Sequence, residues 1–468
     1  MKSKRTKTII LSCVVVLIVA CVCLVLIAIS GVGVSLIWPF GVTQEVTVPT
    51  PYQATLELPQ TTESPEATPK TELPADLVEA MTLIEEQVSQ IRALNATGPV
   101  ERTLISAAEL EEIVAEDFFS DYSDQDARQD ILILSALGLL PKDFDLKQFY
   151  NELYGEQIAG FYDDEEEAMY IVQGMGFGGS EKLTYAHEFT HVLQDQVYGL
   201  DEGLQLNDES CEADSERCAA VQALIEGDAT MTELLWFQSY ATQEDYEDLV
   251  QVYENFESPV FDSAPPYIAA DLYFSYEKGQ VFVQLLYNEG GFGAVDDAFE
   301  NVPVSTEQIL HPERYPHDAP VTVSLPDFSD ALGEGWTLID QNVMGEWYTF
   351  LILNKAYDEV HQLDETFAST ATEGWGGDSY AFYLNEGTDE VVFILDTVWD
   401  TVADADEFAA AFLSYANLRW ESIGSEIMDS PTWVGLDGMV VFVQNGDRSV
   451  WVMAPTQLNV ESILSELQ

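Results

Sequence analysis

The sequence of 468 residues contains few basic side chains. It has 17 Lys+Arg against 83 Asp+Glu, so its formal net charge at pH 7 is -66. A chain with this charge repels the phosphate backbone of nucleic acids, and no cluster of Lys and Arg occurs after residue 7. We therefore expect no DNA or RNA partner.

Cysteine and histidine are also scarce, with five of each. Cys13, Cys21 and Cys23 lie in an apolar N-terminal stretch, which leaves Cys211 and Cys218 for the rest of the chain. So few cysteines exclude a small disulfide-rich scaffold. The last two cysteines either pair and close the short loop 212–217, or remain free thiols.

The N-terminus contains the longest apolar run. Residues 9–29 are apolar or small apart from Ser12, and about 20 such residues cross a bilayer as a helix. Basic residues precede the run and no acidic residue occurs before Glu45, so the sequence predicts a single-pass anchor with residues 1–8 in the cytoplasm and the body outside. A cleaved signal peptide and a lipobox ending at Cys21 are the alternatives, and both also place the body outside.

The composition divides the rest into three parts. Residues 39–74 are rich in Pro and Thr and predict an extended stalk. Residues 75–324 predict a mainly helical domain, with helical periodicity at 76–91, 104–118, 131–140, 180–197 and 217–240 and a β-hairpin within 155–173. Residues 325–468 predict an α+β unit with strands at 379–384, 391–398, 439–443 and 450–454. The expected fold class is therefore α+β, preceded by a transmembrane helix and stalk.

The motif His187-Glu188-Phe189-Thr190-His191 lies inside a predicted helix. With five histidines in the chain, about 0.005 chance matches to HExxH are expected, so chance is a poor explanation. Residues four apart share a helix face, where two imidazoles can bind one zinc ion. Glu188 beside the metal can act as general base toward a zinc-bound water. The alternative is a pair of surface histidines.

A catalytic zinc normally has a third protein ligand. The residues after His191 do not continue as HxxGxxH, so the ligand comes from elsewhere. Glu226 is the candidate, because small residues around it would let its helix pack closely on the first. Asp228 would then accept the free N–H of a zinc-bound histidine. Competing acidic ligands are Glu212, Asp214, Asp228 and Glu233.

With His187, Glu188, His191 and Glu226, the sequence resembles the gluzincin group of zinc metallopeptidases over about residues 150–240. The resemblance implies a Zn²⁺ cofactor, a peptide or protein substrate and a mainly helical peptidase domain with a β-hairpin. In such enzymes the outer hairpin strand pairs with the extended substrate. By that resemblance, Met169–Val172 is the edge strand that receives the peptide.

A further segment, residues 305–315, contains His311, Arg314 and Tyr315 in a chain poor in such groups. A donor of this kind can stabilise the oxyanion that forms during hydrolysis, and gluzincin-like enzymes place a His or Tyr in that role. We therefore predict His311 as a catalytic residue. The alternative is a structural turn in which Arg314 pairs with a carboxylate.

The expected function is a membrane-anchored, extracytoplasmic zinc metallopeptidase. A non-catalytic surface-binding protein with a structural zinc site is one alternative, and a zinc hydrolase acting on a non-peptide bond is another. Glu188 separates the first two, because a structural site needs no carboxylate beside an open coordination position. Acidic walls around a cleft would favour basic or unfolded polypeptides. The oligomeric state does not follow from the sequence.

Overall fold

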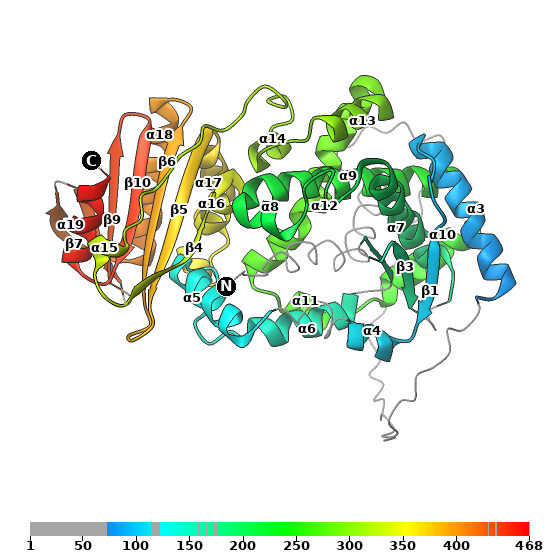
Figure 1. The fold of residues 1–468 in the computed structure, drawn as a ribbon, viewed down its shortest axis with the longest axis horizontal. Coiled ribbons are helices and arrows are strands. Elements are labelled where there is room, and N and C mark those ends of the chain that lie inside the picture. Colours follow the sequence, from blue (N-terminus) through cyan, green and yellow to red (C-terminus); the bar gives the residue numbers. More distant parts are fainter. Residues whose placement is uncertain are drawn as a thin grey trace, which may run out of the picture.

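The computed structural model describes residues 73–113, 122–157, 160–164, 166–172, 176–428, 430–435 and 438–467. These residues form two parts that lie side by side (Figure 1). One part is mainly helical and contains a three-stranded sheet, and the C-terminal part is built on a seven-stranded sheet.

Helix α9 (Ser215–Tyr240) is the centre of the helical part, and its middle is buried throughout. It packs against α12 (Pro266–Gly290), α7 (Gly179–Tyr198) and α3 (Ala75–Arg92). The remaining helices of this part are α4 (Ala107–Ile113), α5 (Asp124–Leu137), α6 (Leu146–Gln157), α8 (Asp208–Ala213), α10 (Gln243–Asn255), α11 (Pro259–Asp262), α13 (Phe292–Glu300) and α14 (Thr306–Leu310).

Two glycines set the distance between α9 and α12. A Cβ atom on Gly227 would lie 2.2 Å from the backbone of Gly279, and one on Gly279 would lie 2.0 Å from the carbonyl oxygen of Ala223. Backbones can approach this closely only where no side chain intervenes. The small residues around Glu226 were expected to let α9 pack closely on the helix of the HExxH motif; α9 does pack against α7, and two of these residues, Ala223 and Gly227, also admit α12.

Helix α7 carries the HExxH motif. Its first turn is closed by Glu181, whose carboxylate accepts the backbone N–H of Gly178 at 2.8 Å. Its apolar face packs against α3 in a cluster that includes Leu183, Phe189 and Val88. Because apolar residues recur every three or four positions, the opposite face of α7, with its two histidines, is directed at α9.

The three-stranded sheet differs from the expected hairpin. Its strands are β1 (Glu101–Ile105), β2 (Gly160–Asp163) and β3 (Ala168–Val172), in the order β1-β3-β2. Strand β3 pairs in parallel with β1 and antiparallel with β2. The prediction that residues 169–172 form an edge strand is therefore wrong, because β1 covers that edge. The helix predicted from residue 104 begins instead as this strand, with α4 after it.

The seven-stranded sheet is antiparallel throughout. Its strands are β4 (Trp336–Asn342), β5 (Trp375–Asn385), β6 (Glu390–Trp399), β7 (Glu421–Ile427), β8 (Ser430–Gly435), β9 (Gly438–Asn445) and β10 (Arg448–Ala454), in the order β4-β5-β6-β10-β9-β8-β7. The strands predicted at 379–384, 391–398, 439–443 and 450–454 lie within β5, β6, β9 and β10. Strands β4, β7 and β8 were not predicted.

Helices cover both faces of this sheet. On one face lie α16 (Gly345–Asn354), α17 (Glu365–Thr372) and α18 (Val402–Arg419), and on the other α15 (Ser329–Leu332) and α19 (Gln457–Glu466). A short 3-10 helix, η2 (Glu359–His361), precedes α17. In β6, Phe393 and Leu395 face the first core, whereas Val392 and Ile394 face the second. Because successive side chains of a strand point to opposite faces, one sheet contributes residues to two separate cores.

The two parts meet near the start of α9. The side chain of Asn342, at the end of β4, accepts the backbone N–H of Ser215 at 2.9 Å. A disulfide joins Cys211 to Cys218, with Cα atoms 5.5 Å apart, and ties α8 to α9 at this point. Of the two alternatives for these cysteines, the structure has the paired one.

The predicted membrane-spanning helix requires a correction. Among the described residues, every helix is too short or too polar to cross a bilayer. The longest ones, α9 and α12, contain several charged side chains within their apolar sequence, which excludes them as spans. The predicted tail at 1–8, the anchor at 9–29 and the stalk up to residue 72 lie outside the described residues. The described chain has a mixed helical and β-sheet fold, and the predicted single-pass, extracytoplasmic location is not upheld.

Candidate metal centre

The predicted zinc ligands lie together where α7 faces α9. The Nε2 atom of His187 lies 3.2 Å from Oε2 of Glu226, and Nε2 of His191 lies 3.6 Å from the same oxygen. One donor atom from each of the three residues lies within 4.8 Å of the other two. All three residues are buried. The four-residue spacing aligns the imidazoles on α7, and α9 brings the carboxylate to them.

Two carboxylate oxygens in this centre have no hydrogen-bond partner among the described residues: Oε1 of Glu226 and Oε1 of Glu188. Leaving such a buried acceptor unsatisfied costs about 1–3 kcal/mol. A bound cation or its water would remove that cost. Two imidazoles and one carboxylate are also the donors of many catalytic zinc sites, which keep a fourth position open. The residues present therefore fit a zinc ion.

Glu188 lies beside the three donors. Its Oε2 atom accepts the backbone N–H of Tyr162, in strand β2, at 3.0 Å. Burial raises the pKa of Glu188 to about 7, although the imidazoles of His191 and His187 act to lower it. A carboxyl group with this pKa can accept and return a proton near neutral pH.

Acceptors lie behind both imidazoles. Nδ1 of His187 is 3.2 Å from Oε2 of Glu233, and Nδ1 of His191 is 2.8 Å from Oε1 of Gln194. An acceptor at Nδ1 fixes the tautomer that keeps Nε2 free to bind a metal. Glu233, considered from the sequence as a competing ligand, thus lies behind a predicted ligand.

A buried chain of contacts extends from Gln194. Its Nε2 atom donates to Asp228 at 2.9 Å, and Asp228 also accepts Nε of the buried Arg92 at 2.9 Å. Arg92 comes from α3 and bonds Asp296 of α13 at 2.7 Å. Asp228 was predicted to accept a histidine N–H directly, but the structure inserts Gln194 between them. The three-residue spacing of His191 and Gln194 on one helix was the available signal for this contact.

The charges in the centre are strongly coupled. Burial alone would raise the pKa of Glu226, but the imidazoles of His191 and His187 outweigh it and lower that pKa to about 2. Burial acts to lower the pKa of His187, but the carboxylates of Glu233 and Glu226 raise it to about 10. The centre thus holds an anionic carboxylate among groups that favour positive charge. A metal ion binding there would displace protons from the imidazoles.

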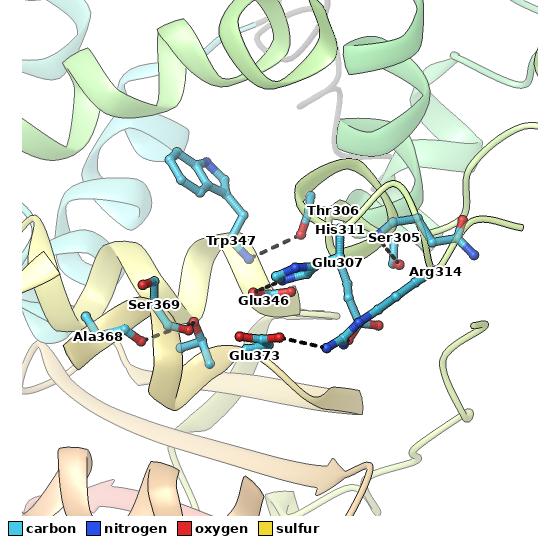
Figure 2. Close-up of polar contacts among 12 residues, drawn as sticks. Ser305, Thr306, Glu307, His311, Arg314, Glu346, Trp347, Ala368, Ser369 and Glu373 are labelled. Atoms are coloured by element: carbon cyan, nitrogen blue, oxygen red, sulfur yellow. Dashed lines mark hydrogen bonds and ion pairs between the residues drawn. The ribbon is translucent and has the colours of Figure 1, made fainter. Parts of the chain in front are cut away.

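His311 does not join this centre. Its Nε2 atom lies 2.9 Å from Oε1 of Glu346 in α16, and Figure 2 shows both residues near Thr306 and Arg314. The backbone N–H of Thr306 donates to Glu216 at the start of α9. At 1.5 Å per residue, Glu216 lies about 15 Å along α9 from Glu226. The predicted oxyanion donor therefore belongs to a second cluster, comprising Glu216, Thr306, Glu307, His311, Arg314 and Glu346.

Comparison with known proteins finds a family match in the C-terminal part. A family described as "Domain of unknown function (DUF8575)" matches residues 336–464, which run from the start of β4 into α19. No curated protein matches the chain. No solved structure matches it either. The metal centre lies outside the matched segment, so its interpretation rests on the geometry of its own residues.

Proposed function

We propose that this protein is a zinc-dependent peptidase whose active site is formed by α7 and α9. The observation that supports the proposal is the convergence of His187, His191 and Glu226, with the carboxyl group of Glu188 beside them. A purely structural zinc site usually has four protein ligands and needs no adjacent carboxyl group. Here three donors and a separate acid occur together.

His187 and His191 would hold zinc through their Nε2 atoms, and Glu226 would hold it through its carboxylate. When bound, zinc lowers the pKa of a coordinated water and polarises the carbonyl group of the substrate. Glu233 accepts a hydrogen bond from the Nδ1–H group of His187, and Gln194 accepts one from that of His191. These hydrogen bonds keep the imidazole rings oriented. Their burial excludes competing water from these contacts.

Glu188 moves the proton. Its Oε1 atom takes a proton from the attacking water and delivers it to the nitrogen of the leaving amine. The N–H of Tyr162 holds the other oxygen, which prevents the carboxyl group from rotating away.

Strand β2 provides a place for the peptide. In the order β1-β3-β2, one side of β2 pairs with β3, and the other side is a sheet edge among the residues that the structure describes. The Tyr162 N–H points to Glu188, so this edge faces the metal centre. An extended peptide lying along it would form main-chain hydrogen bonds with the edge groups other than the Tyr162 N–H, which Glu188 already accepts, and such bonds do not depend on the sequence of the peptide.

The test compares zinc content and peptide hydrolysis in the full chain and three variants. Glu188→Gln keeps the shape of the side chain but removes the base, so it should retain zinc and lose about 10²- to 10⁴-fold in hydrolysis rate. Glu202→Gln makes the same change on an exposed loop and serves as the matched control. His311→Gln should hydrolyse peptides like the wild type, because His311 lies in the second cluster.

The outcomes separate the candidate functions. Zinc binding without hydrolysis of any peptide by the wild-type chain would favour a structural zinc site. Hydrolysis that is equally fast in Glu188→Gln would remove Glu188 from the mechanism. A wild-type protein that binds no zinc after dialysis against the metal would overturn the proposal itself.

A further inference from the structure

A cavity of about 550 Å³ lies between the helical part and the seven-stranded sheet. Its walls come from α5, α9, α12, α16 and the edge strand β4. Much of its lining is apolar, with Leu134 and Leu137 on α5 and Phe274 on α12. None of the three predicted zinc ligands lines it. The cavity is therefore a feature separate from the metal centre.

Carboxylates interrupt this apolar lining. Asp130, Glu212, Asp271 and Asp340 all line the cavity, and its described lining contains no Lys, Arg or His. Asp271 accepts hydrogen bonds from Trp347 Nε1 at 3.2 Å and from the Tyr348 hydroxyl at 3.3 Å. Burial nevertheless raises the pKa of Asp271 to about 6. Its negative charge is thus held in a poorly solvated place, where a cation would be strongly favoured.

Aromatic rings surround these carboxylates. Tyr150, Tyr267 and Tyr348 line the cavity beside Asp271. Burial raises the pKa of Tyr150 and of Tyr267, and the charges of both Asp271 and Asp130 raise it further, so the two acids act on the same two rings. Aromatic faces attract ammonium and guanidinium groups, and the attraction grows to about 2 kcal/mol when water is excluded.

The cavity lies next to the metal centre along α9. Ala219 and Gln222 line it, and Glu226 follows on the same face one turn later. Gln222 and Glu226 are about 6 Å apart along the helix axis. On α12, Ser275 lines the cavity, while the ring of the next residue, Tyr276, lies 6.2 Å from that of His187. The cavity lining and the metal centre are thus about one helical turn apart along α9.

We infer that this cavity binds an organic cation on an apolar stem, namely the lysine or arginine side chain of a substrate polypeptide. The apolar walls accept the methylene groups, and Asp271, Asp130 and the tyrosine rings accept the charged end. The role in substrate selection rests on the proposed peptidase function. Binding of the cation itself does not.

The first experiment measures binding to the full chain without any cleavage. The probes are butylguanidinium and its neutral isostere butylurea, titrated by calorimetry and by the fluorescence of tryptophan, since Trp347 contacts Asp271. The cation should bind at least about tenfold more tightly than the urea. Asp271→Asn should reduce that ratio about tenfold, and Asp130→Asn is the second variant if the first does not fold. Asp330→Asn, an exposed residue of α15, should change nothing.

The second experiment compares cleavage of paired peptides that differ only by arginine or citrulline at one position. Faster cleavage of the arginine peptide is the expected result, with the ratio of arginine to citrulline cleavage falling toward one in Asp271→Asn and staying at the wild-type value in Asp330→Asn. Equal binding of butylguanidinium and butylurea overturns the cavity proposal even if peptides are cleaved. Tight butylguanidinium binding in a protein that cleaves no peptide supports the cation site and overturns its substrate role.

Discussion

Among the described residues, two clusters contain a histidine in contact with a buried glutamate. In the candidate metal centre, His187 lies 3.2 Å from Glu226, and in the second cluster, His311 lies 2.9 Å from Glu346. The carboxyl groups nevertheless respond in opposite ways. The pKa of Glu226 falls to about 2, whereas burial raises the pKa of Glu346 despite its histidine partner. Two imidazoles act against burial at Glu226, whereas at Glu346 one imidazole and the guanidinium of Arg314 act against burial and the carboxylate of Glu373.

The second cluster joins structural elements. Thr306 donates its hydroxyl to Glu216 at 2.7 Å and accepts the backbone N–H of Trp347 at 3.1 Å, which links α9, α14 and α16. Arg314 already supplies a cation there through its ion pairs with Glu307 and Glu373. A histidine in contact with a glutamate is therefore not a metal site by itself. Convergence of several donors, with acceptors behind the imidazoles, is the feature that distinguishes the first cluster.

The largest expected effect is on zinc affinity. It is tested by making the same change, glutamate to glutamine, in each of the two clusters. Glu226→Gln removes an anionic ligand and should weaken zinc binding more than about 100-fold, with loss of hydrolysis. Glu346→Gln is the matched change and should leave zinc affinity unaltered. Zinc content after dialysis and affinity by chelator competition measure both. Equal zinc affinity in the two variants would contradict the assignment of Glu226 as a ligand.

A smaller loss of zinc affinity is expected from a substitution behind the imidazole of His187. Glu233→Gln removes the charge that Nδ1 of His187 contacts, and such outer contacts typically contribute about 10- to 100-fold to metal affinity. Glu202→Gln on the exposed loop is the control. Chelator competition gives the affinity, and zinc should still bind at saturation. An affinity identical to that of the control would show that Glu233 does not orient the ligand.

The smallest effect is expected at Glu216, where burial raises the pKa well above its ordinary value. The folded state then retains a proton that the unfolded chain releases above about pH 4.5, so wild-type stability falls as pH rises from there toward the folded pKa. Glu216→Gln resembles the protonated acid and should stay within about 1 kcal/mol of wild type at pH 5. Urea unfolding should show that the free energy of unfolding of the variant rises relative to that of the wild type as the pH increases. If the free energy of unfolding of the variant instead falls relative to that of the wild type as the pH rises, Glu216 is ionised in the folded protein.

The helices of the metal centre were largely readable from the sequence. The predictions for 180–197 and 217–240 match α7 and α9 within two residues. Both helices show the local periodicity of three to four residues that a helix imposes on a buried face. The HExxH spacing is likewise local, so alignment of His187 with His191 required only the helix itself.

The order of the strands in each sheet was harder to predict from the sequence. The hairpin of β2 and β3 is local and was predicted, but the parallel strand β1 comes from far upstream and displaced β3 from the edge. Strands β4 and β7 lie at the edges of the seven-stranded sheet, and β8 lies next to β7. Edge strands have a mixed pattern of burial, since fewer of their residues enter a core, so their alternation is weak.

The sequence by itself determined that α7 presents two imidazoles and a glutamate on one surface, and it selected a small set of acids as possible third ligands. Only the tertiary structure decided that Glu226 lies in front of the imidazoles and Glu233 behind one of them. It also decided that Gln194 separates His191 from Asp228, and that His311 contacts Glu346. Helix periodicity is imposed by neighbouring residues, whereas these contacts depend on how α9 crosses α7 and α12, which is set by packing between segments distant in the sequence.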